Sequence, residues 1–119
     1  MQKILNSRTE KFIRKFANTM YTQKQILSFL SKNKPMLQDK YHITKIGLFG
    51  SYARKEQTDI SDIDLIVEFE ENTNNLYDIK IAVKQFFKEN LKVDVDLCRE
   101  KYIKTRYKNR ILNEAIYVD

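Results

Sequence analysis

The apolar residues of this chain recur with two different periods, and the changes of period divide it into predicted helices and strands. A helix is predicted over about 23–32, because its apolar residues share one helical face and Thr22 and Gln25 form a capping box at its start. Pro35 suits the first turn of a second, short helix that ends near Tyr41, since the amide hydrogen that proline lacks has no partner in a first turn.

Two apolar segments, 43–49 and 63–69, are short and bounded by polar residues, which is typical of strands. Side chains alternate along the second segment, so that Asp62 and Asp64 fall on one face and an unbroken set of apolar residues falls on the other. We therefore expect the apolar face to pack on helices and the carboxylate face to be open at its start.

A crossover unit follows the second strand. A helix is predicted from Leu76 to about Asn90, with Asn90 as a left-handed C-cap, and a strand is predicted over about 92–98. A strand, helix, strand unit favours parallel pairing with a right-handed crossover, so the starts of the two acidic strands should lie at the same end of the sheet.

The two ends of the chain complete the expected architecture. Residues 1–20 have apolar residues at helical spacing and are expected to form an N-terminal helical extension to a domain of residues 21–119. The basic segment 99–110 is predicted to be a helix docked on the sheet, and the tail 113–119 is apolar enough to close the core. The expected fold class is α/β (α+β), a small mixed sheet of three or more strands with helices packed mainly on one face.

The residues that suggest chemistry are concentrated between Gly50 and Asp64. Gly50 and Ser51 end the first strand and open a helical turn that reaches Arg54. Such a turn can hold phosphates, because glycine lets the backbone come close and the exposed N–H groups and hydroxyl donate hydrogen bonds. Asp62 and Asp64, two residues apart on a strand, point the same way, as a hard divalent cation requires. The stretch therefore indicates a site for a metal-bound nucleoside triphosphate.

A third carboxylate is expected on the strand after the crossover helix, where Asp94 and Asp96 both lie. Asp96 is about 6.6 Å further along that strand, at roughly 3.3 Å per residue. Because the two acidic strands should start at the same end of the sheet, we predict that Asp94 lies beside Asp62 and Asp64. The alternative is that these aspartates are solvated strand ends.

Charge and composition narrow the class of protein. Of the 119 residues, 1–55 include 12 basic and 2 acidic side chains, whereas 56–78 include 8 acidic and no basic ones. A basic chain with an acidic centre fits a cation site surrounded by a surface that attracts phosphate or a partner. The single cysteine, Cys98, excludes an internal disulfide framework, and no apolar run approaches the roughly 20 residues that span a bilayer. We expect a cytoplasmic protein with no membrane contact.

Two further features have a plainer explanation than the chemistry they suggest. His42, the only histidine, lies at the opposite end of the first strand from Gly50, which favours a structural or exposed role over catalysis. The tyrosines and cations interleaved over 99–110 could bind single-stranded nucleic acid, but a solvated helix face is the commoner cause of this pattern. Direct nucleic-acid binding is therefore not expected.

The pattern G-S-x10-D-x-D, formed by Gly50, Ser51, Asp62 and Asp64, resembles that of the polymerase beta superfamily of nucleotidyltransferases, and specifically of the small minimal nucleotidyltransferase (MNT) domains. Four segments are similar to that family, IGLFGSYAR, SDIDLIVEF, KVDVDL and RILNEAIYV, and the resemblance covers about residues 22–118. It implies a polymerase-beta-like nucleotidyltransferase fold.

Two residues depart from the pattern of the resembled family. Lys55 stands where glycine is common, so the loop after Arg54 should adopt a left-handed turn less readily. Asp96 adds an acid where an apolar or small residue is common. Neither departure touches the core motif.

The resemblance also implies an activity. Many members of the family are MntA-type antitoxins encoded beside HEPN-domain ribonuclease toxins, and the antitoxin is implied to transfer AMP from ATP to a tyrosine of the toxin. The resemblance implies that two Mg²⁺ ions are held by Asp62, Asp64 and Asp94. It implies that the phosphates of ATP are held by Gly50, Ser51 and Arg54.

Alternatives to this implied activity, and to the implied role of Arg54, stay open from the residues alone. The chain could act as an antitoxin by complex formation without catalysis. It could instead be a nucleotidyltransferase that acts on a small molecule or on an RNA end. For Arg54, an ordinary surface ion pair is the alternative to a phosphate contact.

Overall fold

The computed structural model describes residues 20–119, so the helical extension expected for 1–20 falls outside the described residues apart from Met20. One sheet has the strand order β3-β2-β1-β4, with β1 Ile43–Phe49, β2 Ile63–Phe69, β3 Val95–Arg99 and β4 Ile116–Tyr117. β1 is antiparallel to β2 and β4, whereas β2 and β3 are parallel. The predicted mixed sheet is confirmed, including the parallel pairing across the crossover helix.

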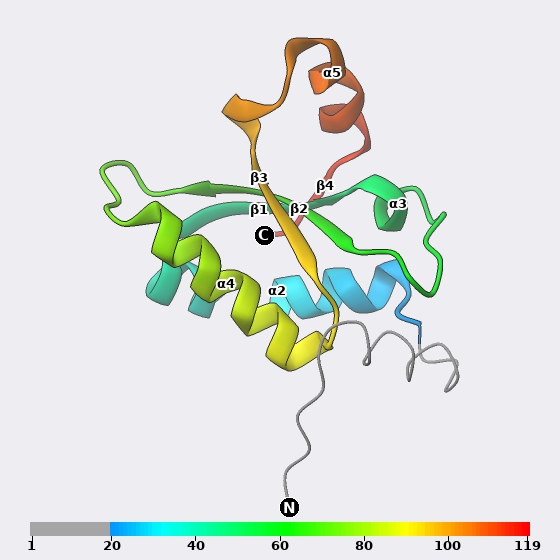
Figure 1. Ribbon diagram of the computed structural model, residues 1–119, viewed down its shortest axis with the longest axis horizontal. Helices are drawn as coiled ribbons and strands as arrows, with labels where there is room; N and C mark the ends of the chain where they lie inside the picture. The colour runs from blue at the N-terminus through cyan, green and yellow to red at the C-terminus, as the bar shows by residue number, and fades with distance from the viewer. Residues whose placement is uncertain (1–19) are drawn as a thin grey trace, which may run out of the picture.

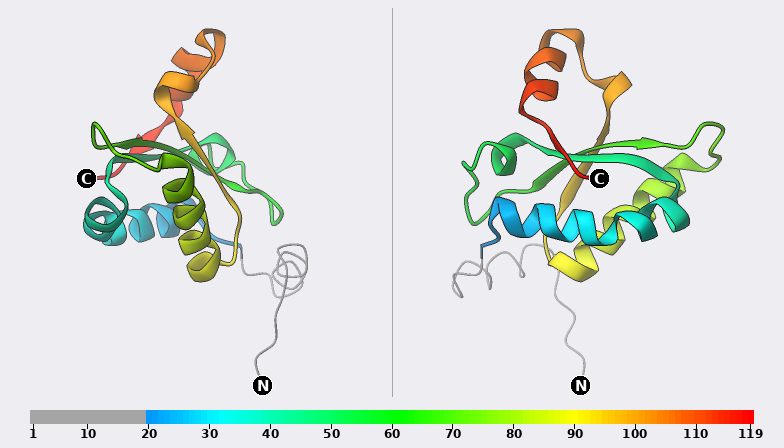
Figure 2. Two further views of the ribbon diagram at one scale, coloured as in Figure 1. Left: turned by 60° about the vertical axis from the view of Figure 1, so that its left-hand side comes forward. Right: turned by 180° about the vertical axis from the view of Figure 1, so that it is seen from behind.

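Two helices, α2 Gln23–Tyr41 and α4 Leu76–Leu91, cover one face of this sheet (Figures 1 and 2). Each helix buries one apolar stripe, with Ile26, Leu30 and Leu37 from α2 and Val83, Phe87 and Leu91 from α4. The apolar face of β2 is buried with them, as predicted. The carboxylate-bearing face of β2 is therefore turned away from both helices. Within residues 20–119, no helix is both long and apolar enough to cross a membrane.

The first helix is longer than predicted. α2 continues through Pro35 to Tyr41, so the prediction of two helices separated near residue 33 is wrong. Proline removes the backbone hydrogen bond to the carbonyl of Ser31, an exposed residue whose carbonyl water can reach. Beyond the proline, Leu37 lies on the same buried face as Leu30, and its burial contributes about 1.5–3 kcal/mol that offsets the missing bond.

The crossover helix also extends beyond its predicted end. Asn90 remains helical and donates from Nδ2 to the carbonyl of Phe86 at 2.8 Å, so the prediction of Asn90 as the left-handed cap is wrong. Lys92 takes that conformation instead, with φ 59°. The extra residues bury Leu91, which is 5% exposed. As a result β3 begins at Val95, later than predicted.

The C-terminal segment leaves the sheet before it returns to it. η1 Glu100–Tyr102 and α5 Thr105–Glu114 stand on the side of the sheet opposite α2 and α4 (Figure 1). The prediction of a helix docked on the sheet is wrong, because no residue of α5 is buried and Tyr107 is 38% exposed. The tail then pairs with β1 as β4 and places Val118 in the core, as predicted for the tail.

Candidate active site

The Gly-Ser turn begins where β1 ends. α3, Gly50–Ala53, is a single helical turn, and Gly50 starts it with φ +73°, a conformation that glycine adopts without strain. Phe49 pairs with Asp64 across the antiparallel ladder, which brings Gly50 against the Asp64 side chain. A Cβ on Gly50 would overlap Oδ2 of Asp64 and would stand 3.0 Å from its Cγ. The turn and this carboxylate are therefore in direct contact.

The parallel register of β2 and β3 decides which aspartate lies beside Asp64. Asp96 is its partner in the parallel ladder, and the charge of Asp96 acts on the Asp64 carboxyl. Asp94 precedes β3, where its carbonyl accepts the N–H of Ile63 at 3.1 Å and its carboxylate lies 3.5 Å from Nζ of Lys88 on α4. The expectation for Asp94 therefore holds in part: the ladder, continued by one residue from Ile63 and Val95, sets Asp94 opposite Asp62, whereas Asp96 and not Asp94 lies opposite Asp64.

Asp64 lies in an unfavourable environment for a negative charge. Partial burial raises the pKa of its carboxyl from 3.8 to about 6, and the charges of Asp96 and Asp62 add to the shift. Asp62 is half-buried just before β2. The positive charge of Arg54 lowers the pKa of Asp64 and so opposes part of the shift. A pKa of about 6 means that the Asp64 carboxyl binds a proton at mildly acidic pH.

The three neighbouring carboxylates offer only oxygen ligands, which hard cations prefer. Among residues 20–119, no three acidic, histidine or cysteine side chains converge closely enough to enclose a metal ion by themselves. Mg²⁺ is typically held by one or two carboxylates and completes its octahedron with water and substrate phosphates. The pair formed by Asp64 and Asp96, with the charge of Asp62 nearby, fits such an ion.

The residues after Gly50 keep the turn tight. Ser51 is half-buried at the start of α3, and its carbonyl accepts the N–H of Glu56 at 2.8 Å. Lys55 takes the left-handed conformation, with φ 59°, although the sequence predicted that a lysine would disfavour it. Its N–H bonds to the carbonyl of Tyr52 at 3.3 Å. The turn therefore keeps its shape without glycine at this position, at a cost of about 1–2 kcal/mol in backbone strain.

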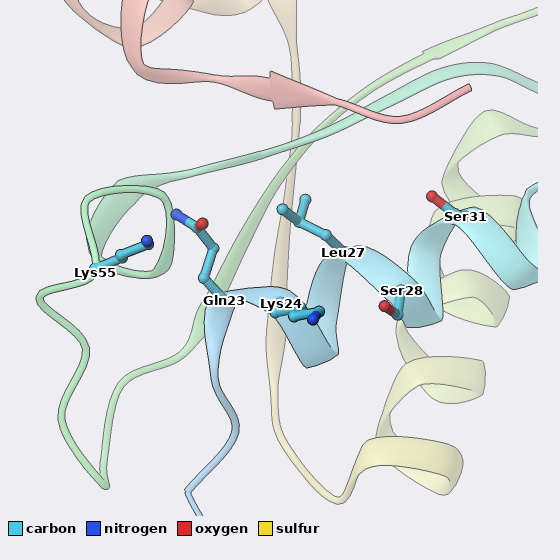
Figure 3. A pocket seen from close by; sticks show the side chains of 6 residues that line it. All are labelled: Gln23, Lys24, Leu27, Ser28, Ser31 and Lys55. Atoms are coloured by element: carbon cyan, nitrogen blue, oxygen red, sulfur yellow. The ribbon is translucent and has the colours of Figure 1, made fainter.

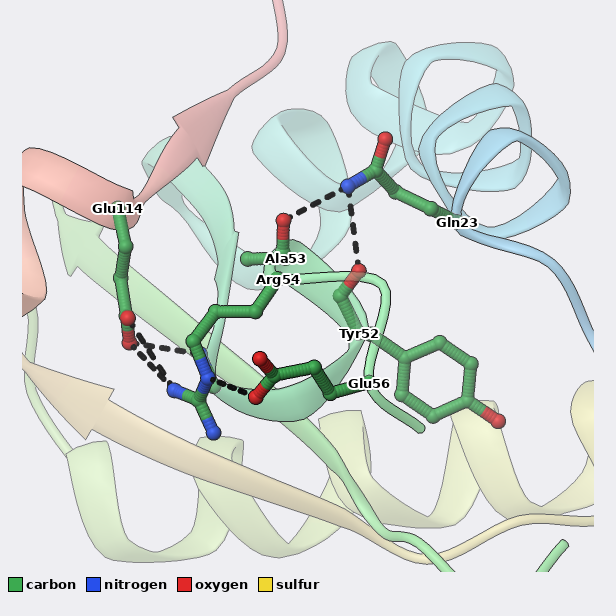
Figure 4. A network of polar contacts seen from close by, with 7 residues as sticks. Gln23, Tyr52, Ala53, Arg54, Glu56 and Glu114 are labelled. Carbon is green, nitrogen blue, oxygen red and sulfur yellow. Dashed lines mark hydrogen bonds and ion pairs between the residues drawn. The ribbon is translucent and has the colours of Figure 1, made fainter. Parts of the chain in front are cut away.

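Glu114, at the end of α5, was not predicted as a site residue, yet it contacts the turn directly (Figure 4). Its Oε1 accepts the N–H of Gly50 at 3.1 Å, and its two oxygens accept from Nη1 of Arg54 at 3.2 and 3.1 Å. Arg54 also donates from Nε to Glu56 at 2.9 Å. The structure thus places Arg54 in the surface ion pairs that are the alternative to a phosphate contact. The one sequence signal for Glu114 was its place in the segment RILNEAIYV.

The other end of the turn is held by α2. Nε2 of Gln23 donates to the carbonyl of Ala53 at 2.8 Å and to that of Tyr52 at 3.2 Å (Figure 4). The last carbonyls of a short helix have no partners within it, so Gln23 satisfies two of them. The Tyr52 side chain is fully buried and anchors the turn in the core. Nothing in the sequence indicated the role of Gln23.

Two remaining features lie away from the carboxylates. His42 ends α2 at the far end of β1, and its Nδ1 lies 3.6 Å from the Glu70 carboxylate, which fits the structural role predicted for it. An open hollow of about 570 Å³ lies between α2 and the end of the turn (Figure 3). Its lining residues are Gln23, Lys24, Leu27, Ser28, Ser31 and Lys55, and they include none of the candidate carboxylates.

Comparison with known protein families and sequences identifies related chains. Residues 24–118 match the family model of the nucleotidyltransferase domain. A Methanocaldococcus jannaschii protein that is provisionally named a protein adenylyltransferase is 42% identical over 100 residues, which cover 83% of this chain and 100% of that protein. The protein adenylyltransferase MntA of Thermococcus cleftensis is 33% identical over 99 residues, which cover 83% of this chain and 98% of MntA.

Two solved structures share the fold. One, described as a minimal nucleotidyltransferase, matches with a TM-score of 0.67 and 26% identity and covers 82% of this chain and 97% of its own. The other is a toxin-antitoxin complex with AMP-PNP, which matches with a TM-score of 0.55 and 25% identity and covers 82% of this chain and 72% of its own.

Proposed function

Because this chain belongs to the nucleotidyltransferase domain family, as a minimal nucleotidyltransferase of the polymerase beta superfamily, we propose that it is an antitoxin that transfers AMP from ATP to a toxin. The acceptor is a tyrosine hydroxyl of a HEPN-family ribonuclease, and the modification neutralises that ribonuclease. The reaction takes place in the cytoplasm, where the single Cys98 stays reduced.

One observation carries this proposal: Gly50 touches Asp64, which lies opposite Asp96 in the parallel ladder. A phosphate-binding turn and an oxygen-ligand cation site are thus adjacent, as nucleotidyl transfer requires. The relatives support the acceptor class, since two carry the name protein adenylyltransferase and a similar structure is a toxin-antitoxin complex with AMP-PNP. AMP transfer to a protein is therefore favoured over transfer to a small molecule or an RNA end.

In this proposal the phosphates of ATP bind at the start of α3. The N–H of Gly50 is bonded to Glu114, so Ser51 supplies the amide and hydroxyl that face the phosphates. Gly50 contributes the absence of a side chain, which lets the turn lie against Asp64. Arg54 supports the turn through Glu114 and is not needed as a phosphate contact.

The carboxylates act on the reacting end of the nucleotide. Asp64 and Asp96, with the charge of Asp62 nearby, would hold Mg²⁺, which when bound neutralises phosphate charge and polarises the α-phosphoryl group. The tyrosine oxygen attacks the α-phosphorus in line and forms a new P–O bond, while the bond from that phosphorus to the α–β bridging oxygen breaks and pyrophosphate leaves. Asp96 is exposed, whereas Asp62 and Asp64 are half-buried, so in this proposal Asp96 accepts the tyrosine proton.

Label transfer to the cognate HEPN-family toxin tests this proposal. Wild-type protein should label the toxin from α-labelled ATP and not from γ-labelled ATP, because AMP is transferred and pyrophosphate leaves. Asp64→Asn keeps the size of the side chain but removes its charge, and it should reduce labelling by about 100-fold or more. Asp39→Asn, on the exposed face of α2, is the matched control and should label like the wild type. Transfer of the γ-label, or full labelling by Asp64→Asn, would refute AMP transfer.

A second function, neutralisation by complex formation alone, is favoured by one observation. The N–H of Gly50 and the guanidinium of Arg54 are both bonded to Glu114, so two groups that could hold phosphate are engaged within the chain. Growth rescue from the toxin distinguishes the two functions. Rescue that persists in a variant with Asp62, Asp64 and Asp96 all changed to Asn would favour the complex, whereas loss of rescue at unchanged binding would favour catalysis.

A further inference from the structure

Residues 99–114 form an arm, made of the end of β3, η1 and α5, that projects from the side of the sheet opposite α2 and α4 (Figures 1 and 2). Carboxylates fix both ends of this arm. Glu68 of β2 accepts the N–H of Glu100 at 3.2 Å, and Glu114 accepts the N–H of Gly50 at 3.1 Å. The arm therefore has a fixed place relative to the Gly-Ser turn.

The middle of the arm is strongly basic. No acid lies between Glu100 and Glu114, and five cations do: Lys101, Lys104, Arg106, Lys108 and Arg110. None of the five forms an ion pair with an acidic side chain of residues 20–119. By contrast, Lys45, Arg54 and Arg99 near the two ends of the arm are each paired with a glutamate. The charge of the arm is thus not neutralised by the part of the chain that the structure describes.

The placement of these cations opposes the stability of α5. Lys104 is the N-cap residue, without a side-chain hydrogen bond, and Arg106 lies in a first turn that has no acid, although the helix dipole disfavours cations there. Lys104 with Lys108 and Arg106 with Arg110 are also like-charge pairs at a spacing of four, which destabilises a helix. A solvated helix face explains their exposure but not this arrangement, whereas an acidic partner would make each of these contacts favourable.

The tyrosines of the arm indicate the chemical class of the partner. Arg106 and Arg110 lie over the ring of Tyr107 at 4.7 and 5.6 Å, and Lys101 lies over that of Tyr102 at 5.2 Å. Single-stranded nucleic acid binds aromatic residues by stacking bases on their rings, and these rings are already engaged with cations. Exposed tyrosine and arginine side chains are instead enriched at the centres of protein interfaces. A protein fits this surface better than RNA does.

We propose that the arm is the docking surface for the acceptor protein, and that this protein presents an acidic surface beside the residue that receives AMP. The inference rests on the proposed function and adds the chemistry of the partner. Glu114 at the end of the arm touches Gly50, and Gly50 touches Asp64, so a protein held on the arm lies next to the carboxylates. Charge complementarity would set the rate and specificity of the encounter.

Equilibrium binding of a catalytically inactive form of the cognate HEPN-family toxin, measured without ATP, tests the docking surface independently of AMP transfer. The arm variant combines Lys104→Glu and Arg106→Glu, and the matched control combines Lys32→Glu and Lys84→Glu on α2 and α4. All four residues are exposed, and both variants change the net charge equally. We expect the Kd of the arm variant to rise by at least about tenfold and that of the control to stay within about twofold. The arm variant should fold, because it places acids at the start of α5.

Each other outcome has a definite meaning. A Kd that the arm variant leaves unchanged, or that the control raises equally, overturns the proposal. Unchanged toxin binding with loss of binding to a labelled single-stranded RNA overturns it in favour of a nucleic-acid surface, and unchanged toxin binding with loss of ATP affinity assigns the arm to the nucleotide. If toxin binding depends on the arm but wild-type protein transfers no label, the docking surface stands and the proposed enzymatic function fails.

Discussion

Gly50 and Asp64 are in contact, and the absence of a side chain on the glycine makes this contact possible. A Cβ at Gly50 would overlap the carboxylate, and the residue also has φ +73°, so both space and backbone conformation require glycine. Asp64 in turn lies opposite Asp96 in the parallel ladder of β2 and β3, so it links the turn to a second carboxylate. A change at the turn therefore reaches the carboxylate pair directly.

Gly50→Ala should disrupt both the turn and the carboxylates. We expect the free energy of unfolding to fall by about 2–4 kcal/mol, from left-handed strain and overlap with Asp64, and label transfer per folded molecule to fall by about 100-fold. Urea denaturation and label transfer measure the two effects.

Gly47→Ala is the control for this change. Its Cβ would stand 2.8 Å from Cδ1 of Tyr117 and 3.1 Å from Cγ2 of Ile66, so it should also destabilise the fold. It does not touch Asp64, and transfer per folded molecule should stay near the wild-type rate. Equal loss of transfer in both variants would show that the contact between Gly50 and Asp64 has no special part in catalysis.

Glu114 should matter for catalysis through the turn that it holds. Glu114→Ala leaves the N–H of Gly50 without its partner and should lower the rate of transfer at saturating ATP by at least about tenfold. Glu114→Gln retains an oxygen that can accept this N–H, and it should recover much of the rate although the charge facing Arg54 is lost. If the two variants are equally slow at matched thermal stability, the hydrogen bond to Gly50 does not position the turn.

Stability in the absence of divalent cations should depend on the pH through Asp64. The folded-state pKa of its carboxyl is raised from 3.8 to about 6, so the folded state binds the proton more tightly than the unfolded state does. The stabilisation that comes from this tighter proton binding is complete below pH 3.8 and is lost as the pH rises through about 6. Because the group is partly exposed, we expect it to change the free energy of unfolding by about 1 kcal/mol.

The difference between wild type and Asp64→Asn isolates this contribution, because asparagine does not titrate in this range. Urea midpoints measured across the window should fall more steeply with rising pH in the wild type than in the variant. Mg²⁺ should reduce the difference in slope by favouring the ionised carboxylates. A parallel pH dependence of the two proteins would contradict the raised pKa of Asp64.

Lys55→Gly should stabilise the protein. Lys55 has φ 59°, and glycine removes left-handed strain of about 1–2 kcal/mol while adding about 0.4–1 kcal/mol of unfolded-state entropy. A net gain of about 0.5–1 kcal/mol in the free energy of unfolding is expected by urea denaturation. Lys55→Ala removes the same side chain but keeps the strain, so a comparable gain in the alanine variant would rule out the backbone as the cause.

The features that were predictable from the sequence are those set by local patterns. The two central strands, 43–49 and 63–69, have the predicted bounds because alternation and the polar residues around them define both ends. The turn at Gly50 was predictable for the same reason. The face that carries Asp62 and Asp64 followed from the period of the strand, and the opposite, apolar face is buried with residues of α2 and α4.

The features that were not predictable depend on contacts between distant parts of the chain. Because α4 continues far enough to bury Leu91, β3 begins later in the chain than predicted. The later start changes which aspartate of β3 lies opposite Asp64, and that residue is Asp96. Glu114 acts on a residue 64 positions earlier in the chain, and no local pattern marks such a pair. Proline usually occupies the first turn of a helix, and this preference predicted a second helix at Pro35. The burial of Leu37 instead favours one helix that continues through Pro35.

The most direct test of the central claim, that Asp96 and not Asp94 completes the catalytic carboxylates, compares Asp96→Asn with Asp94→Asn. Both changes remove one charge and keep the size of the side chain, but only Asp96 lies opposite Asp64 in the ladder, whereas the Asp94 carboxylate lies 3.5 Å from Nζ of Lys88. Label transfer to the toxin from α-labelled ATP should fall by about 100-fold or more in Asp96→Asn and stay within about threefold of wild type in Asp94→Asn. Loss of transfer in Asp94→Asn with retention in Asp96→Asn would contradict this account of the site.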